Sequence, residues 1–238
     1  MELFENQNYV SVENVHYAND GTVTLDLSDK RALKLSVNVW SDLGQPRDLP
    51  LTDEQLEILE REACYTMIRN KVLSFLAVRE HSATELRRKL KQRFFKLKNC
   101  DFSALLERCL QEMQERDFQS DERFARRFVE SKLANKPLGP FRILQDLQNR
   151  GISSELAKTV LNELSDQDLW LKKASECLIR LQKKGKKQET AALSQKLFQR
   201  GFAWETIELA LENYQTLDKV PATGELDSCQ GTFSANNN

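Results

Sequence analysis

Two stretches decide the fold: ILQDLQNRGISSELAKTVLNEL (143–164) and LSQKLFQRGFAWETIELALENY (193–214). Laid one on the other, they agree at their apolar positions, and Arg-Gly-Ile (150–152) falls on Arg-Gly-Phe (200–202). Apolar residues at a spacing near 3.6 predict a helix on each side of the glycine. The glycine is typical of a helix that ends in the left-handed conformation. Each stretch therefore predicts a helix, a tight turn and a second helix.

A third and less regular copy lies upstream. Leu86 and Leu90 begin it, and apolar residues over 105–113 complete it. Arg-Phe-Phe (93–95) stands where the glycine turn is expected, and an insertion follows it. Another apolar-periodic segment precedes each copy, at 53–79, 121–134 and 168–184. The sequence thus predicts tandem repeats of three-helix units that form an elongated, curved body.

The N-terminal region has a different period. Apolar and polar residues alternate over 9–15, 22–27 and 31–39, with turn signals at 19–21 and 28–30. This pattern predicts a small three-stranded antiparallel meander. Because three strands are marginally stable alone, we expect the sheet to pack on the helices that follow it. A linker with one glycine and two prolines occupies 41–50.

The expected fold class is therefore mainly α, with a small N-terminal β meander. The chain of 238 residues has only 8 glycines and 5 prolines, which suits helices joined by short connections. The predicted divisions are an N-terminal β extension and linker (1–50), three three-helix units (51–117, 118–166 and 167–217) and a disordered tail (218–238).

Several functional classes find no support in the sequence. No apolar run is long enough to span a bilayer, and the acidic start lacks the features of a signal peptide. The five cysteines are far apart and form no CxxC pair, which indicates reduced thiols in a cytoplasmic protein. Two histidines are too few for an ordinary zinc site with them. We expect no catalytic residues, no metal and no cofactor, and therefore no enzyme.

Four blocks of sequence carry a resemblance to a known family. They are REHSATELRRKL (79–90), DERFARRFV (121–129), LGPFRILQDLQNRGIS (138–153) and KLFQRGFAWETIELAL (196–211). In this order and spacing they resemble the RecX family of recombinase regulators over roughly 64–214. The missing glycine turn near 93–95 and the tail after 215 depart from the family pattern. The β segment resembles an extension found on longer members.

The resemblance implies a function without chemistry. RecX proteins bind the filament of a RecA-type recombinase, lie in its groove, and inhibit its ATPase and strand exchange in recombination, DNA repair and the SOS response. It also implies a monomer, with single- or double-stranded DNA as a further partner. The cysteines and the lack of long apolar runs predict a cytoplasmic protein that binds no membrane. The alternative is a DNA-binding helical regulator that acts without a recombinase.

Basic residues are the candidate contacts with such a partner. The middle of the chain is mildly basic, whereas both ends are acidic. The candidate residues for binding a partner or DNA are Arg87, Arg88, Lys91, Arg93, Arg123, Arg126, Arg127 and Arg142. The plainer interpretation is a solvated surface or intramolecular ion pairs. Further lysines at 96, 98, 183, 184, 186 and 187 extend these basic runs.

Three other features have mainly structural interpretations. Arg150 and Arg200 precede the glycine turns, where a cation favours the end of a helix dipole. Ser82 and Glu85 predict a capping box at a helix start. The tryptophans are expected in the core rather than as interface anchors; they are Trp40, Trp170 and Trp204.

Overall fold

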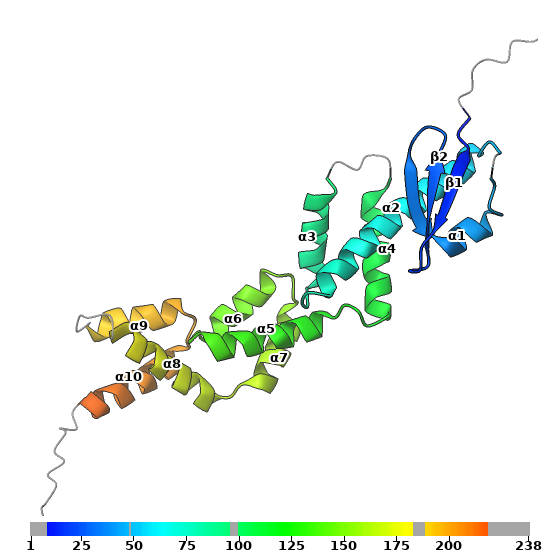
Figure 1. Ribbon diagram of the computed structural model, residues 1–238. Helices are drawn as coiled ribbons and strands as arrows, with labels where there is room; N and C mark the ends of the chain where they lie inside the picture. Colours follow the sequence, from blue (N-terminus) through cyan, green and yellow to red (C-terminus); the bar gives the residue numbers. More distant parts are fainter. Residues whose placement is uncertain (1–8, 48, 96–99, 183–188, 219–238) are drawn as a thin grey trace, which may run out of the picture. The chain divides into compact units, whose positions relative to one another are not determined.

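The computed structural model describes residues 9–47, 49–95, 100–182 and 189–218 (Figure 1). The strands are β1 (Val12–Tyr17), β2 (Thr22–Leu27) and β3 (Ala32–Ser36). The helices are α1 (Val37–Asp42), α2 (Asp53–Leu76), α3 (Ala83–Arg93), α4 (Phe102–Glu115), α5 (Asp121–Asn135), α6 (Pro140–Gln148), α7 (Ser154–Leu164), α8 (Gln167–Gln182), α9 (Thr190–Gln199) and α10 (Trp204–Asp218). The mainly helical fold with a small sheet is confirmed.

The contacts divide the chain into two compact parts. The larger part comprises Met1–Ala134 and Leu144–Leu164, and the smaller part comprises Asn135–Ile143 and Ser165–Asn238. No helix in the described ranges is both long and apolar enough to cross a membrane.

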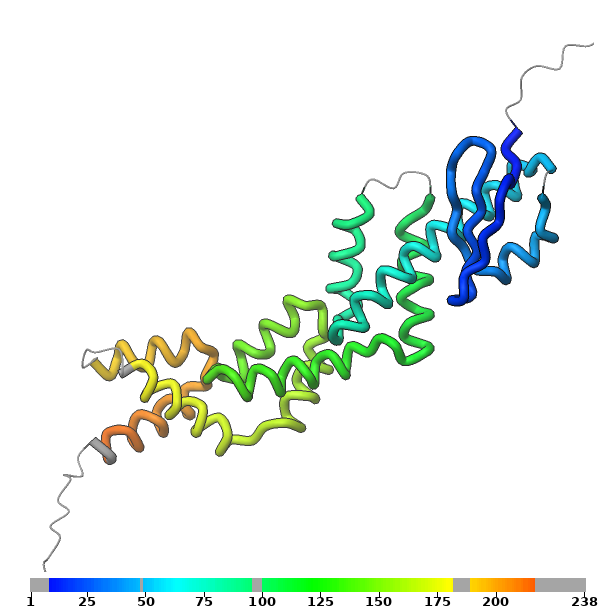
Figure 2. Tube along the Cα trace, viewed as in Figure 1, coloured from blue at the N-terminus to red at the C-terminus, as the bar shows by residue number. Residues whose placement is uncertain are grey.

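The sheet is an antiparallel meander in the order β1-β2-β3, as the alternation predicted. Its inner face supplies buried Val23, Leu25 and Leu35 to a core that Leu59 of α2 completes. The expected packing of the sheet on the following helices is therefore confirmed. Figures 1 and 2 show α2 continuing past the sheet toward α3 and α4.

The predicted strand 31–39 is too long, because β3 ends at Ser36 and α1 follows at once. The hydroxyl of Ser36 accepts a hydrogen bond from the backbone N–H of Asn38, which is the geometry of a helix N-cap. Trp40 then turns inward and is fully buried in the sheet core. The alternation of apolar residues across 31–39 concealed this change of structure.

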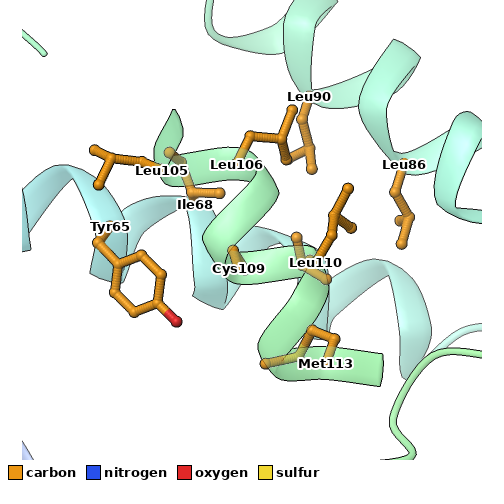
Figure 3. Close-up of a cluster of buried hydrophobic side chains, with 10 residues drawn as sticks. Tyr65, Ile68, Leu86, Leu90, Leu105, Leu106, Cys109, Leu110 and Met113 are labelled. Carbon is orange, nitrogen blue, oxygen red and sulfur yellow. The ribbon is translucent and has the colours of Figure 1, made fainter. Parts of the chain in front are cut away.

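A second core lies where α2, α3 and α4 meet (Figure 3). The capping box of Thr52 and Gln55 begins α2, and this helix contributes Ile68 and Val72 to the core. The buried residues from the other two helices are Leu86, Leu90, Leu105, Leu106, Cys109, Leu110 and Met113. These are the positions that the irregular first repeat predicted as apolar.

The two glycine turns are formed as predicted. Gly151 has φ 82° and Gly201 has φ 85°, in the left-handed region that favours glycine. After each glycine the next residue donates back to the helix it has left, from Ile152 to Leu147 (3.2 Å) and from Phe202 to Leu197 (3.4 Å). Both apolar side chains are buried, which seals the end of each helix.

Each turn also rests on the start of another helix in the same compact part. Ser82, which caps α3, donates through its hydroxyl to the carbonyl of Arg150 at 2.6 Å. At the start of α6, the Gly139 N–H donates to the carbonyl of Arg200 at 2.9 Å. The repeats therefore share a junction, in which an Arg-Gly turn sits on the first turn of the preceding middle helix.

Two expectations about single side chains are wrong. Trp204 is 55 % exposed at the start of α10, so it is not a core residue, whereas Trp170 is partly buried. Glu85 does not complete a capping box, because its carboxylate is bonded to other side chains. The predicted basic residues Lys96, Lys98, Lys183, Lys184, Lys186 and Lys187 and the predicted disordered tail lie outside the described residues, apart from the end of α10.

Candidate functional site

The eight candidate cations lie on three helices. Four are on α3 (Arg87, Arg88, Lys91 and Arg93), three are on α5 (Arg123, Arg126 and Arg127), and Arg142 is on the first turn of α6. Three of them are bound to carboxylates within the chain, and three others, all on α3, have no carboxylate within ion-pair distance among the described residues.

Arg87 is bound within the chain. Its guanidinium makes a bidentate contact with the carboxylate of Glu107 on α4, with Nε–Oε1 at 2.8 Å and Nη2–Oε2 at 2.7 Å. This contact lowers the pKa of Glu107 and raises that of Arg87. Because a bidentate arginine–carboxylate pair has a defined geometry, Arg87 connects α3 to α4 rather than presenting its charge to a partner.

Two of the α5 arginines are bound as well. Arg123 contacts the carboxylates of Glu80 (2.6 Å) and Asp117 (2.8 Å), and it also donates to backbone carbonyls that precede α5. Arg126 contacts Glu163 of α7 at 2.5 Å. The interpretation as intramolecular pairs therefore describes both residues.

The remaining cations of α3 are exposed. In the described residues, no carboxylate lies within ion-pair distance of Arg88, Lys91 or Arg93. Arg88 and Lys91 are three residues apart and so are neighbours on one helix face. Arg93 follows on another side of the last turn. We call the exposed surface that these three side chains contribute to, around more than one side of α3, the α3 basic face. An unneutralised face of this kind attracts an acidic protein surface or a phosphate backbone.

Two lysines add charge beside this face. The ammonium of Lys89 lies 4.7 Å from the centre of the Phe75 ring, and that of Lys71 lies 4.8 Å from it. Lys71 belongs to α2 and was not among the predicted site residues. Only the packing of α2 against α3 brings it there, so no local pattern in the sequence could have identified it.

Arg127 and Arg142 are exposed at other places. Arg127 lines a hollow of about 540 Å³ with Val78, Phe124 and Phe128, and Val78 is 82 % exposed. Arg142 lies against Gly201, where its backbone faces the turn between α9 and α10. Arg127 and Arg142 thus belong to helices other than the one that carries the α3 basic face.

A buried ionic cluster that the sequence did not reveal joins α3 to the turn at Gly151. Glu85 is 3 % exposed and accepts from His81 Nδ1 at 2.9 Å and from Arg79 at 3.1 Å, and it also pairs with Arg150. The guanidinium of Arg150 lies over the Phe128 ring at 4.9 Å. Glu85 is thus fully satisfied, and the cluster has the character of a structural joint. The i, i+4 spacing of His81 and Glu85 was its only signal in the sequence.

The environment shifts the pKa values of His81 and Glu85, the two buried groups of this cluster. Burial lowers the pKa of His81, and the charges of Arg79 and Lys89 lower it further, against the opposing effect of Glu85. For Glu85, burial raises the pKa, but the hydrogen bond from His81 and the charges of Arg79 and Arg150 outweigh it, so that the pKa is lowered. The folded protein therefore holds a neutral imidazole that donates to a carboxylate.

This arrangement predicts that stability falls as the pH is lowered. Below about pH 6.5 the unfolded chain protonates His81 while the folded chain resists, so stability is lost down to the folded pKa of His81. Each unit by which that pKa is lowered corresponds to about 1.4 kcal/mol. The lowered pKa of Glu85 adds a second loss below about pH 4.5. Urea unfolding at pH 7.5 and pH 5.5 measures the first loss.

The variant His81→Asn keeps an N–H donor for Glu85 without a titrating ring, and should be less sensitive to pH over this range. His16→Asn is the matched control, because it removes an imidazole whose side chain is 67 % exposed and should leave the loss unchanged. Equal pH dependence of all three proteins would contradict the role of His81.

Among the described cysteines, burial opposes reaction of the thiols of Cys64, Cys109 and Cys177. Cys64, Cys100, Cys109 and Cys177 are free. Burial raises the pKa of the Cys109 thiol to about 11, which opposes formation of the nucleophilic thiolate. Among the described residues, no three or more histidine, cysteine or carboxylate side chains gather as they would around a metal ion.

Comparison with known proteins agrees with this mainly helical arrangement. The family model described as "RecX, second three-helix domain" matches residues 120–161. A protein of Salmonella heidelberg named "Regulatory protein RecX" is 34% identical over 128 residues, which cover 52% of this chain and 75% of the relative. A protein of Prosthecochloris aestuarii with the same name is 28% identical over 157 residues, covering 63% and 91%.

Solved structures show the same fold. A crystal structure described as regulatory protein RecX aligns with a TM-score of 0.68 at 16% identity, over 85% of this chain and 99% of the other. The RecX structure from Lactobacillus salivarius aligns with a TM-score of 0.56 at 18% identity, over 64% and 97%. The resemblance that the four sequence blocks indicated is confirmed by these matches.

Proposed function

Because this chain belongs to the RecX family of regulatory proteins, we propose that it regulates a RecA-type recombinase by binding the recombinase filament. In this proposal it docks in the filament groove, bridges adjacent protomers, and inhibits ATP hydrolysis and strand exchange. The chain supplies no chemistry. A ligand that binds one filament state more tightly shifts the population toward that state, and inhibition follows if that state turns over slowly.

The observation that supports this proposal most is the α3 basic face. Arg88, Lys91 and Arg93 are exposed, and no carboxylate in the described residues neutralises them. A cation that exchanges a carboxylate partner within its own chain for one on another protein contributes little binding free energy. The unpaired cations are therefore the ones that can contribute to an encounter with an acidic surface of a filament, or with its DNA.

In this proposal, the arginines that are bound within the chain have a structural role. Arg87, Arg123 and Arg126 maintain the positions of the helices, and their effect on the filament is indirect. Arg127 and Arg142 stay candidates for secondary contacts. We further propose that the chain acts as a cytoplasmic monomer, with 51–117, 118–166 and 167–217 as its three units.

A binding experiment distinguishes this function from a DNA-binding regulator. A fluorescent single-stranded oligonucleotide is titrated with the protein, first bare and then coated with the RecA-type recombinase and a slowly hydrolysed ATP analogue. We expect binding to the coated strand at concentrations that leave the bare strand free. Equal or tighter binding to the bare strand, with a steep salt dependence, would favour the DNA-binding alternative.

A further inference from the structure

A second surface of the larger part has the features of a peptide-binding groove. Between β3 and α2 lies a hollow of about 830 Å³, within the size range of ligand sites. One wall is the backbone stretch 31–34, the other is α2 from Glu60 to Ser74, and Arg93 and Phe94 close one end. We call it the β3–α2 groove. The binding of a filament does not account for it, because the α3 basic face meets it only at Arg93.

One wall of the groove is an open sheet edge. Strand β3 is at the edge of the sheet, and in the described residues no strand pairs with its outer side. The Leu27 N–H donates to the Arg31 carbonyl at 2.8 Å, so these two residues form a hydrogen-bonded pair of the antiparallel ladder. Hydrogen-bonded and non-hydrogen-bonded pairs alternate along such a ladder. Ala32 and Lys34 are in non-hydrogen-bonded pairs, and their backbone N–H and C=O groups therefore point away from β2.

The lining of the groove combines an apolar floor with a basic rim. Leu33, Ala63, Met67 and Phe94 are among its lining residues, and Met67 is 39 % exposed. The cations that line it are Arg31, Lys34, Lys71 and Arg93. Arg31 is already paired with Glu60 and Asp29, and Lys34 with Asp20. In the described residues, no carboxylate lies within ion-pair distance of Lys71 or Arg93. The unneutralised charges of Lys71 and Arg93 therefore complement an acidic occupant.

We propose that the β3–α2 groove binds an extended acidic segment of a partner protein, which adds to β3 as a fourth strand. Its backbone bonds the free groups of Ala32 and Lys34, as in other cases of strand addition. Because side chains alternate along a strand, apolar residues of the segment cover Met67 and Leu33 while its carboxylates meet the basic rim. A nucleic acid is less suitable, since an apolar floor offers nothing to a phosphate backbone.

The test uses the whole chain and a synthetic probe. The probe is a fluorescein-labelled peptide of about eight residues that alternates glutamate with valine, and its anisotropy reports binding. We expect Lys34→Pro to weaken binding about tenfold, because proline removes an outward N–H and is tolerated on an edge strand. Lys34→Ala keeps that N–H and should weaken binding less than about threefold. Met67→Glu, on α2, should weaken it about tenfold by placing charge on the apolar floor.

The outcomes separate the proposal from simple charge attraction. Loss of binding in Lys34→Pro and Met67→Glu, with a nearly normal Lys34→Ala, supports strand addition in this groove. If Lys34→Pro does not fold, as judged by circular dichroism, Met67→Glu decides alone. Three results would overturn the proposal: no binding of the acidic peptide, equal binding of a peptide with lysine in place of glutamate, or a single-stranded oligonucleotide that displaces the peptide and loses affinity in Met67→Glu. None of these measurements involves a recombinase, so they do not depend on the proposed function.

Discussion

Replacing Gly201 by alanine is expected to destabilise the smaller compact part by about 2–5 kcal/mol. The left-handed conformation at φ 85° costs an alanine about 1–2 kcal/mol. In addition, an added Cβ would overlap the backbone nitrogen and Cβ of Arg142, and forced overlap in packed regions costs about 1–3 kcal/mol. The contact is with backbone, so a simple change of rotamer cannot relieve it.

Urea unfolding followed by tryptophan fluorescence measures this effect, since Trp170 and Trp204 lie in the same compact part as Gly201. Gly21→Ala is the matched control, because Gly21 also has a positive φ (77°) but meets nothing within 4 Å of an added Cβ. It should show the conformational cost alone. Equal losses in the two variants would contradict the close contact between the turn and the start of α6.

Reversing the three charges of the α3 basic face is expected to abolish most of the regulatory effect. In Arg88→Glu/Lys91→Glu/Arg93→Glu, the concentration needed to halve the recombinase ATPase should rise about tenfold or more. The variant should fold, because all three side chains are exposed and none has a carboxylate partner in the described residues. The measurement is the DNA-dependent ATPase rate as a function of the concentration of the variant.

The same number of charges can be reversed elsewhere as a control. Arg61, Lys158 and Lys172 are exposed on α2, α7 and α8, and their reversal changes the net charge of the chain equally. This control variant should inhibit as the unmodified chain does. If both triple variants lose inhibition alike, net charge rather than the α3 basic face is responsible. If neither loses it, the basic face is not the contact.

The fold was predictable where its signals are local. The Arg-Gly turns at 150–151 and 200–201, and the apolar period on each side, lie within short stretches and were sufficient to place most helices. The helix α1 was missed because Val37 and Val39 continue the alternation of β3, whereas the signal that stops it is the single hydroxyl of Ser36. A single polar side chain hardly changes the alternation of apolar residues, so the alternation alone does not reveal where the strand ends.

The candidate site was less predictable, because pairing is a tertiary property. Arg87 and Arg88 are adjacent in the sequence, yet one is bound to Glu107 and the other has no carboxylate partner in the described chain. The buried joint of Glu85 and Arg150 escaped notice for the same reason: its members are far apart in the chain. Sequence density of basic residues therefore located the basic surface, and the structure was needed to separate structural cations from available ones.

The measurement that tests the proposed function most directly is the single-stranded-DNA-dependent ATPase of the cognate RecA-type recombinase, titrated with this protein. Binding in the filament groove with contacts to adjacent protomers predicts inhibition at well below one copy of this protein per recombinase protomer. An unchanged ATPase rate with the folded protein in excess would contradict the proposed function.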